Sequence, residues 1–418
     1  RRYYEAGLLN NIDEKFVEEV LEYWQKNYNK RIDPSIQIAF FELTGKKEKR
    51  VIPGNEMWNE IIPYFNDQVM EAGYRDKNIY DILINTSNST KTVIKRVGGY
   101  YYDANNNPVN RDSVNNILFN TEPEYIIKPS DNNNGVGIEK ITVYDSKMYL
   151  SEKQVTLDEI EKIYQFNFII QKVIQQHPVM AEPHPSSVNT LRMVTLRWKG
   201  QIHYLLTFAR FGSNNSVMDN AGAGGVCVGV SDTGEFLDVA IDEHCKTHTS
   251  HPTTGFEFKN LGKIPNFEKF INFVKDLHTQ ILHHDFVSWD IAVGIDGEPV
   301  FIEANFAGAT WLYQMATRKP MFGDLTEEIL EYISQLKDKD RNIINRKVLS
   351  NTNKLKKKNR KLKNELTSKE SEITSLKERI EKLEIDLKNK EIELTKLDSE
   401  LKKIKSSRIW RLYRTLRK

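Results

Sequence analysis

The chain has 418 residues, enough for two or three domains, and its 39% hydrophobic content supports a sizeable core. A wholly disordered protein is therefore excluded. The net charge of +2 is unevenly distributed, because residues 351–418 carry 22 Lys/Arg against 11 Asp/Glu, while the first 350 residues carry 38 against 47. Since the positive charge is confined to the C-terminal segment, we expect no nucleic-acid partner.

The two cysteines, Cys227 and Cys245, allow at most one disulfide, which favours a reducing compartment. No run of about eighteen apolar residues occurs, so we predict no transmembrane span. The opening residues Arg1–Tyr4 form neither a methionine start nor an apolar signal segment, as is typical of a sequence trimmed from a longer protein. We expect a cytoplasmic location.

Hydrophobic periodicity predicts helices over Phe16–Tyr28, Glu56–Gly73 and Phe267–Leu282. Strand-like runs, many separated by Gly, Asn or Asp turns, lie at Tyr125–Lys128, Ile138–Tyr144, Phe168–Ile174, Leu191–Trp198, Ile202–Phe211, Gly225–Val230 and Pro299–Asn305. This pattern predicts an α+β fold with mostly antiparallel sheets rather than a βαβ repeat. We expect an N-terminal α/β region over residues 1–76 and a catalytic region over residues 77–340.

A polar loop with Gly135 and Gly137 follows the predicted strand that ends at Lys128. Glycines let backbone N–H groups approach phosphate oxygens, and a nearby lysine supplies the opposite charge. No helix opens with Gly-Lys-Ser/Thr after this loop, so it is not a Walker motif. Alone, such a segment is more typical of a simple hairpin turn.

Three side chains that carry oxygen atoms are expected at the same end of the hairpin predicted around Asp296-Gly297. Asp290 lies on its first strand, and Glu303 and Asn305 lie two residues apart on its second, so the latter two share a face. Carboxylate and amide oxygens suit a Mg²⁺ ion that bridges nucleotide phosphates. Taken alone, this pattern is more typical of a polar hairpin with an exposed face.

Together, the two segments resemble the ATP-grasp superfamily in order and spacing, from about Lys77 to Asn305. The pattern of D-alanine–D-alanine ligase can be laid on this region. The resemblance implies two α+β subdomains that grip ATP, with ATP and one or two Mg²⁺ ions as cofactors. The implied metal ligands are Asp290, Glu303 and Asn305, including the thirteen-residue interval between the two carboxylates.

The same resemblance implies the residues that contact the nucleotide. Lys77 and Lys128 match the two lysines that contact phosphate, and the loop with Gly135 and Gly137 matches the mobile loop that covers the triphosphate. The segment similar to the linker strand that hydrogen-bonds adenine contains Gln171, Lys172, Val173 and Ile174. Lys172 would also reach the nucleotide.

A narrower resemblance is to the sugar-transfer-associated ATP-grasp group, whose members sit in bacterial surface-polysaccharide pathways. It rests on His177-Pro178, Ser187–Thr195, Asp219–Gly225, His251–Gly255 and Trp289-Asp290. It implies an acceptor site that contains Asn189, Asp219, Asn220, Gly224, Gly225 and His251.

The chain departs from the ligase pattern at two places. The ligases carry an arginine two residues before the first metal carboxylate, where this chain has Ser288. Their ribose-binding glutamate has no clear equivalent in residues 175–177. Arg192 and Arg210 lie on predicted strands, and we expect one of them to supply the missing positive charge as a catalytic residue.

Other clusters of polar residues receive simpler interpretations. The acidic, histidine and cysteine side chains of residues 242–251 have the spacing of neither a Cys/His finger nor an HExxH site, so we do not predict zinc. His283-His284 is interpreted as a helix C-terminal cap rather than an acid/base relay. Cys227, in an apolar run, is assigned to the core.

After Gly323 the sequence contains no helix breaker, and from Leu355 apolar residues recur on an alternating three-four step over about seven heptads. This pattern predicts a coiled coil over residues 341–405 that self-associates through residues 355–404. Asn359 at an a position favours a parallel dimer, whereas lysines at two d positions should weaken the seam. The alternative is a single solvated helix packed on the globular part.

The final segment, residues 406–418, combines an apolar helical face with five positive charges. This composition is typical of an interfacial helix that places aromatics in the headgroup layer and arginines on anionic lipid. We expect a peripheral position at the inner face of the cell membrane. A basic solubilising end or a helix that docks on a protein is the alternative.

The resemblance implies an ATP-dependent carboxylate–amine ligase that works through an acyl phosphate. The implied substrate is a sugar acid, an amino acid or a lipid-linked glycan in capsule or cell-surface polysaccharide biosynthesis. Two alternatives remain: a sugar or glycan kinase on the same fold, and a membrane-associated coiled-coil scaffold with a decayed ATP site.

Overall fold

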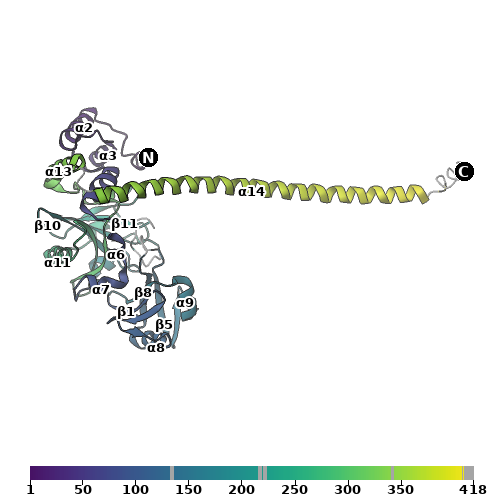
Figure 1. Cartoon of the computed structure of the whole chain (residues 1–418), viewed down its shortest axis with the longest axis horizontal. Coiled ribbons are helices and arrows are strands. Elements are labelled where there is room, and N and C mark those ends of the chain that lie inside the picture. Colours follow the sequence, from purple (N-terminus) through teal and green to yellow (C-terminus); the bar gives the residue numbers. More distant parts are fainter. Residues whose placement is uncertain (132–135, 215–218, 220–223, 340–342, 407, 409–418) are drawn as a thin grey trace. The chain divides into compact units, whose positions relative to one another are not determined.

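The computed structural model describes residues 1–131, 136–214, 219, 224–339, 343–406 and 408 (Figure 1). The chain divides into two compact units, Arg1–Val348 and Leu349–Lys418. Both sheets and the candidate site belong to the first unit, and a single long helix dominates the second. The two units are therefore described separately.

The first sheet has eight strands in the order β3-β2-β1-β8-β4-β5-β6-β7. Every neighbouring pair is antiparallel. Its strands are β1 Thr92–Val97, β2 Tyr100–Asp103, β3 Pro108–Val109, β4 Glu124–Pro129, β5 Glu139–Tyr144, β6 Lys147–Leu150, β7 Lys153–Val155 and β8 Phe168–Lys172. Helices α8 (Arg111–Thr121) and α9 (Leu157–Tyr164) lie beside this sheet and contribute to its apolar core (Figure 1).

The second sheet has seven strands in the order β13-β12-β11-β10-β9-β14-β15, and it is also antiparallel throughout. Its strands are β9 Thr190–Trp198, β10 Gln201–Phe211, β11 Val226–Val230, β12 Phe236–Ile241, β13 Thr247–His248, β14 Phe286–Val293 and β15 Pro299–Asn305. Helix α11 (Phe267–Thr279) packs its buried aromatic and aliphatic face against this sheet. All eight residues of β14, which lies between β9 and the edge strand β15, are buried, so this strand is covered on both faces.

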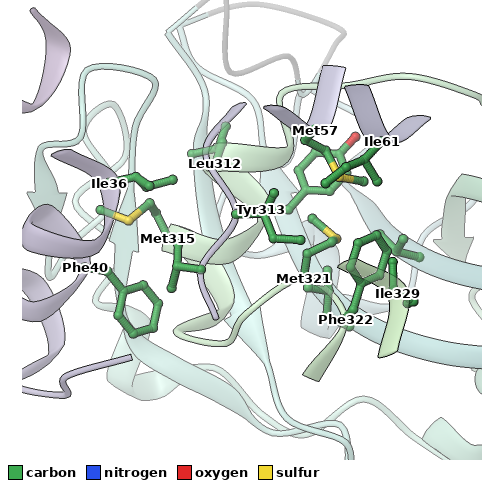
Figure 2. Close-up of a cluster of buried hydrophobic side chains, with 14 of the residues drawn as sticks. Ile36, Phe40, Met57, Ile61, Leu312, Tyr313, Met315, Met321, Phe322 and Ile329 are labelled. Atoms are coloured by element: carbon green, nitrogen blue, oxygen red, sulfur yellow. The ribbon is translucent and has the colours of Figure 1, made fainter. Parts of the chain in front are cut away.

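The N-terminal helices share one apolar core with the end of the catalytic region. Ile36 and Phe40 meet Leu312 and Met315 there, and Figure 2 shows these side chains in the same cluster. The helices before β1 are α1 Arg2–Glu5, α2 Glu14–Tyr28, α3 Ser35–Thr44, α4 Gly54–Glu56, the π-helix η1 Met57–Ile61, α5 Ile62–Phe65, α6 Glu71–Arg75, the 3₁₀ turn η2 Lys77–Ile79 and α7 Tyr80–Leu83. Besides α11 and the long C-terminal helix, the described helices after β8 are α10 Pro178–Ala181, the 3₁₀ turn η4 Phe258–Asn260, α12 Thr310–Thr317, the 3₁₀ turn η5 Gly323–Leu325 and α13 Thr326–Lys339.

Two sequence expectations for the N-terminal region need correction. Residues 1–76, expected as an α/β region, contain helices and no strand. The single helix expected over Glu56–Gly73 is interrupted, because α5 ends at Phe65 and Asn66 adopts an extended conformation with φ −121° and ψ 130°. The side chain of Asn66 hydrogen-bonds to other segments, which explains why the helix ends there.

The second unit is dominated by α14, Ile343–Ser406. The predicted long helix is thus confirmed. Its heptad residues are solvent-exposed in the single chain, with Leu376 at 52% and Leu383 at 59%. Among the described residues, no helix is both long enough and apolar enough to cross a membrane.

Candidate active site

A cavity of about 730 Å³ lies where the two sheets face each other. The eight-stranded sheet contributes Ile126, Lys128 and Gln171 to its wall, and the seven-stranded sheet contributes Thr190, Arg192, Arg210, Asp290, Glu303 and Asn305. Most of the residues that the sequence assigned to the nucleotide and the metal therefore come together in one place.

The two predicted phosphate lysines line this cavity and are both buried. Lys77 opens the 3₁₀ turn η2, and its backbone N–H donates to the carbonyl of Ser130 at 2.8 Å, next to the loop after β4. Its ammonium group lies 3.3 Å from the Glu303 carboxylate. Burial, reinforced by the charge of Lys77, lowers the pKa of Lys128 to about 8. A bound phosphate would favour the charged form of Lys128 again, as an anion does for any nearby ammonium group.

The three predicted metal ligands share one end of the β14–β15 hairpin. Asp290 pairs with Glu303 across the ladder, and Ser288 pairs with Asn305. The Asn305 amide nitrogen lies 3.3 Å from both an Asp290 oxygen and a Glu303 oxygen. Burial works against ionisation of Glu303, but Lys77 and Lys128 outweigh it and hold its pKa at about 2. Glu303 is therefore a carboxylate at neutral pH.

Both candidate catalytic arginines contact Asp290. Arg192 on β9 is the cross-strand partner of Asp290, and its guanidinium group bonds both carboxylate oxygens, at 2.5 and 2.8 Å. Arg210 on β10 lies 3.5 Å from Asp290 and also pairs with Asp219. Despite burial, the charge of Asp290 keeps the pKa of Arg192 well above its ordinary value. Ser288, two residues before Asp290, pairs with Val194 on β9, and its hydroxyl has no hydrogen-bond partner within the described part of the chain.

This donor set fits Mg²⁺, with one change from the geometry present. Glu303 and Asn305 provide hard oxygen ligands, but the Asn305 amide presents its nitrogen to the carboxylates, so it would have to rotate by half a turn to offer its oxygen. Asp290 would share its oxygens with Arg192. Neither here nor elsewhere in the described residues could a group of three His, Cys, Asp or Glu side chains hold a metal ion, so this site would depend on two carboxylates and one amide.

Residues 60–329 match the family model for sugar-transfer associated ATP-grasp proteins. The chain belongs to this family. The two antiparallel sheets around a shared cavity are its ATP-grasp fold. No curated protein sequence matches the chain.

Solved structures with a similar ATP-grasp region are distant in sequence. L-amino acid ligase from Bacillus licheniformis is 12% identical, with a TM-score of 0.34 over 63% of this chain and 48% of that chain. D-alanine–D-alanine ligase from Bacillus anthracis is 11% identical, with a TM-score of 0.36 over 66% of this chain and 72% of that one. VanG D-Ala:D-Ser ligase from Enterococcus faecalis is 13% identical, with a TM-score of 0.35 over 65% and 64%. The chain thus spans about half of the Bacillus licheniformis ligase.

The segment expected to hold adenine in this ATP-grasp protein lies at the cavity wall. Gln171, Lys172 and Ile174 line the cavity, whereas Val173 does not contribute to its lining. Strand β8 ends at Lys172, two residues earlier than predicted. The Lys172 ammonium group pairs with Glu122 at 2.6 Å, so it would have to leave this partner to reach a nucleotide.

The glycine loop of the ATP-grasp site is described only in part. Gly137 has a φ of +79°, and a Cβ there would lie 3.0 Å from the ring of Pro129, so the turn requires glycine. Gly135 lies outside the described residues. Val136 and Ile138, on either side of Gly137, line the cavity.

The predicted acceptor residues fall into two groups. Asp219 lines the cavity and is held there by Thr190 and Arg210. Gly224 has a φ of +92° and lies beside Ser213, and Gly225 is buried just before β11. Asn220 lies outside the described residues.

Of the described acceptor residues only Asp219 lines the cavity, and Asn189 and His251, like Gly224 and Gly225, are not part of its wall. The amide group of Asn189 donates to the carbonyls of Met180 and His184, and His251 is hydrogen-bonded to the carbonyl of Gly212 at 2.8 Å. These buried side chains hold neighbouring loops, so any effect on an acceptor would pass through those loops.

Among the cavity residues that were not recognised from the sequence, Tyr313 and Gly308 bear directly on the arginine pair. The Tyr313 hydroxyl on α12 accepts a hydrogen bond from Arg192 at 2.8 Å. A Cβ at Gly308 would lie only 2.1 Å from that hydroxyl, so glycine is needed beside it. The signal that could have found them was the segment directly after Asn305, since a chain that leaves a ligand strand turns next to the site.

Proposed function

We propose that the chain is an ATP-dependent carboxylate–amine ligase. The observation that carries this proposal is the convergence of Lys77, Lys128 and Glu303 with the arginine pair Arg192 and Arg210 on one cavity. The γ-phosphoryl group of ATP would pass to a substrate carboxylate, giving an acyl phosphate and ADP. An amine would then attack the acyl carbon and release phosphate, which leaves an amide.

In this reaction the protein mainly positions charges. Lys77 and Lys128 would bind phosphate oxygens, and Gln171 to Ile174 would lie along the adenine. Glu303, Asn305 and a shared Asp290 would hold Mg²⁺, which neutralises phosphate charge when bound. Arg192 is positioned by both Asp290 and Tyr313, so its charge is fixed before a substrate arrives.

The substrate carboxylate is proposed to bind at the arginine end of the cavity. Arg210 lines the cavity, and its Nε is buried without a hydrogen-bond partner within the described chain. A buried donor of this kind is stabilised by an incoming oxyanion. We propose a sugar acid, or an amino acid, destined for a surface glycan as the substrate, and the family description "sugar-transfer associated" supports the link to sugars. Asn189, Gly224, Gly225 and His251 would shape the acceptor loops.

The test is ADP release from Mg²⁺-ATP with pools of sugar acids and amino acids. We expect release that requires both a carboxylate and an amine, and that is lost in Glu303→Ala. Glu298→Ala is the matched control, because Glu298 lies on the same hairpin but is paired with Lys269 away from the cavity. Release with a hydroxyl acceptor alone would replace the ligase with a kinase. Nucleotide binding without turnover on any acceptor, lipid-linked glycans included, would favour a scaffold.

We also propose that the chain self-associates through residues 355–404 and contacts the membrane through residues 406–418. The exposed heptad leucines of α14 support self-association, because a second helix packed against them would bury these side chains. Most of the basic tail lies outside the described residues, so its proposal rests on composition. Anionic liposomes should bind the full chain and not a chain that ends at residue 405. Equal binding of the two proteins to the liposomes would contradict membrane contact through residues 406–418, and the proposed location would then be the cytoplasm.

A further inference from the structure

A second cavity, of about 900 Å³, shares no lining residue with the first. Its wall combines the turn after α1, the end of α3, strands β12 and β13, and the residue that follows α12. Nothing in the proposed ligase reaction uses this cavity. Its polar lining includes Lys46, Lys246 and Arg318 together with Glu42 and Asp238.

Arg318 is the unusual member of this wall. It caps the C-terminus of α12 with a φ of +57°, a left-handed conformation that costs free energy for any residue other than glycine. The Nη1 atom of its guanidinium group is buried and, among the described residues, has no hydrogen-bond partner. Burial without a compensating carboxylate lowers the pKa of Arg318 to about 10. An unpaired cation at such a position is costly unless an anion joins it.

A favourable interaction with the helix dipole does not account for this arginine. Arginines near helix C-termini commonly hydrogen-bond the last carbonyl groups. Within the described structure, the Arg318 guanidinium group forms no such bond, and the neighbouring Lys319 is instead paired with Asp232 at 2.8 Å. The cap is made by the Arg318 backbone N–H, which donates to Gln314. The side chain is thus left without a structural role in the cap.

We propose that this second cavity binds the phosphate group of a small anionic ligand, with the Arg318 guanidinium group as its anchor. Lys46 and Lys246 are exposed on the same wall, and neither forms an ion pair within the described chain. Of the two carboxylates, Glu42 accepts from Asn11 at 3.2 Å. Three cations against two carboxylates give the wall a net charge of +1, which favours an anion. A phosphate group has more acceptor oxygens than a carboxylate, so it can accept from the guanidinium and ammonium groups at the same time.

The test compares binding of inorganic phosphate to the full chain, Arg318→Gln and Lys319→Gln by calorimetry. Arg318 does not line the ATP cavity, so any phosphate bound there is common to all three proteins. We expect binding at the second cavity to weaken about tenfold or more in Arg318→Gln, as for loss of one charge-assisted hydrogen bond, and to be unchanged in Lys319→Gln. Without phosphate, Arg318→Gln should melt no lower than the parent chain, since it removes a partly buried charge that has no ion pair within the described chain.

Equal phosphate binding by the parent chain and Arg318→Gln would overturn the proposal, and so would binding of acetate as tight as that of phosphate. A third arm uses vesicles that contain phosphatidic acid. Arg318-dependent binding to vesicles without binding of free phosphate would assign the cavity to a lipid surface and contradict a small-molecule site. The proposal does not depend on the ligase reaction, so it stands or fails separately.

Discussion

Arg192 on β9 and Asp290 on β14 lie directly opposite each other, and the guanidinium group bonds both carboxylate oxygens. Arg210 contacts the same aspartate and joins it to Asp219. These four side chains, all in the cavity wall, therefore form a connected series of ion pairs in which positive and negative groups alternate. Because each charge has a partner before any ligand binds, the site is electrostatically organised in advance.

Breaking this pair should be costly. Asp290→Asn leaves Arg192 buried with one neutral partner, and we expect the free energy of unfolding to fall by about 3–5 kcal/mol. The double variant Arg192→Met/Asp290→Asn should lose less than the sum of the two single variants, because it removes both charges. Urea denaturation measures each value. Lys199→Ala, which breaks the exposed pair with Glu328, is the control, with an expected loss of about 0–1 kcal/mol. A similarly small loss for Asp290→Asn would contradict the ion-pair account.

Lys128 should make both stability and nucleotide binding depend on pH. Its pKa is lowered in the folded protein from 10.5 to about 8, so between these values the unfolded chain binds more protons than the folded one. The free energy of unfolding therefore rises as the pH increases from about 8 to 10, because Lys128 loses its charge in the folded protein. Below pH 8 Lys128 is charged, and the full cost of burying that charge is present. ATP affinity should fall over the same range, because ATP prefers the charged lysine.

Urea denaturation and ATP titrations at pH 7, 8, 9 and 10 test this expectation. Lys128→Met should remove the pH dependence that belongs to this site. Lys140→Met is the control, since Lys140 is half-exposed, paired with Glu124 and not part of the cavity wall. An identical pH profile in the parent chain and Lys128→Met would show that Lys128 does not titrate in this range.

Gly308→Ala should disturb the arginine site through Tyr313. The added methyl group would lie 2.1 Å from the Tyr313 hydroxyl, so the ring must move and its hydrogen bond with Arg192 is lost. We expect a loss of about 1–3 kcal/mol in stability and a fall of roughly tenfold or more in ADP release. Gly73→Ala is the matched control, because it lies in helix α6 with open space around its Cβ and should be neutral or slightly stabilising.

A second variant separates the collision from other effects. Tyr313→Phe added to Gly308→Ala removes the hydroxyl that collides, so part of the lost stability should return. Activity should not return with it, because Arg192 still lacks this partner. If Gly308→Ala is as stable and active as Gly73→Ala, the close approach of Gly308 to Tyr313 is not needed.

The heptad face of α14 gives a prediction for the oligomeric state. Leu383→Asp places a charge at a d position and should convert a self-associated chain into a monomer. Ser375→Asp introduces the same charge at an outward c position and should leave the assembly intact. Analytical ultracentrifugation measures both. A monomeric parent chain would refute self-association through residues 355–404.

The most accurate predictions concern the elements whose hydrophobic periodicity alone indicates the secondary structure that they adopt. Strand β15, Pro299–Asn305, has the predicted limits, because its alternating residues follow an Asp-Gly turn. The long helix α14 is confirmed because its periodicity contains no breaker. The mismatch at Ser288 led to the prediction of a replacement arginine, which stays a prediction, and the cross-strand register places Arg192 opposite Asp290.

Features that depend on contacts between distant segments were not predictable from local pattern. The break after Phe65 arises because the side chain of Asn66 bonds to residues more than two hundred positions away. The roles of Tyr313 and Arg318 likewise depend on where α12 packs against the sheet. Helical periodicity predicts the apolar face of such a helix, but not which polar groups its ends will meet.

The hydrogen bonds of Asn66 also have a consequence for protein engineering. Its amide donates to the carbonyls of Phe286 and Phe306 at 2.8 and 2.7 Å, and its oxygen accepts from the backbone N–H of Phe286. One N-terminal side chain thus clamps the start of β14 to the turn that follows β15. A chimera or expression fragment that begins after Asn66 would lose these hydrogen bonds. A fusion that transfers the catalytic region to another protein should therefore include the N-terminal helices.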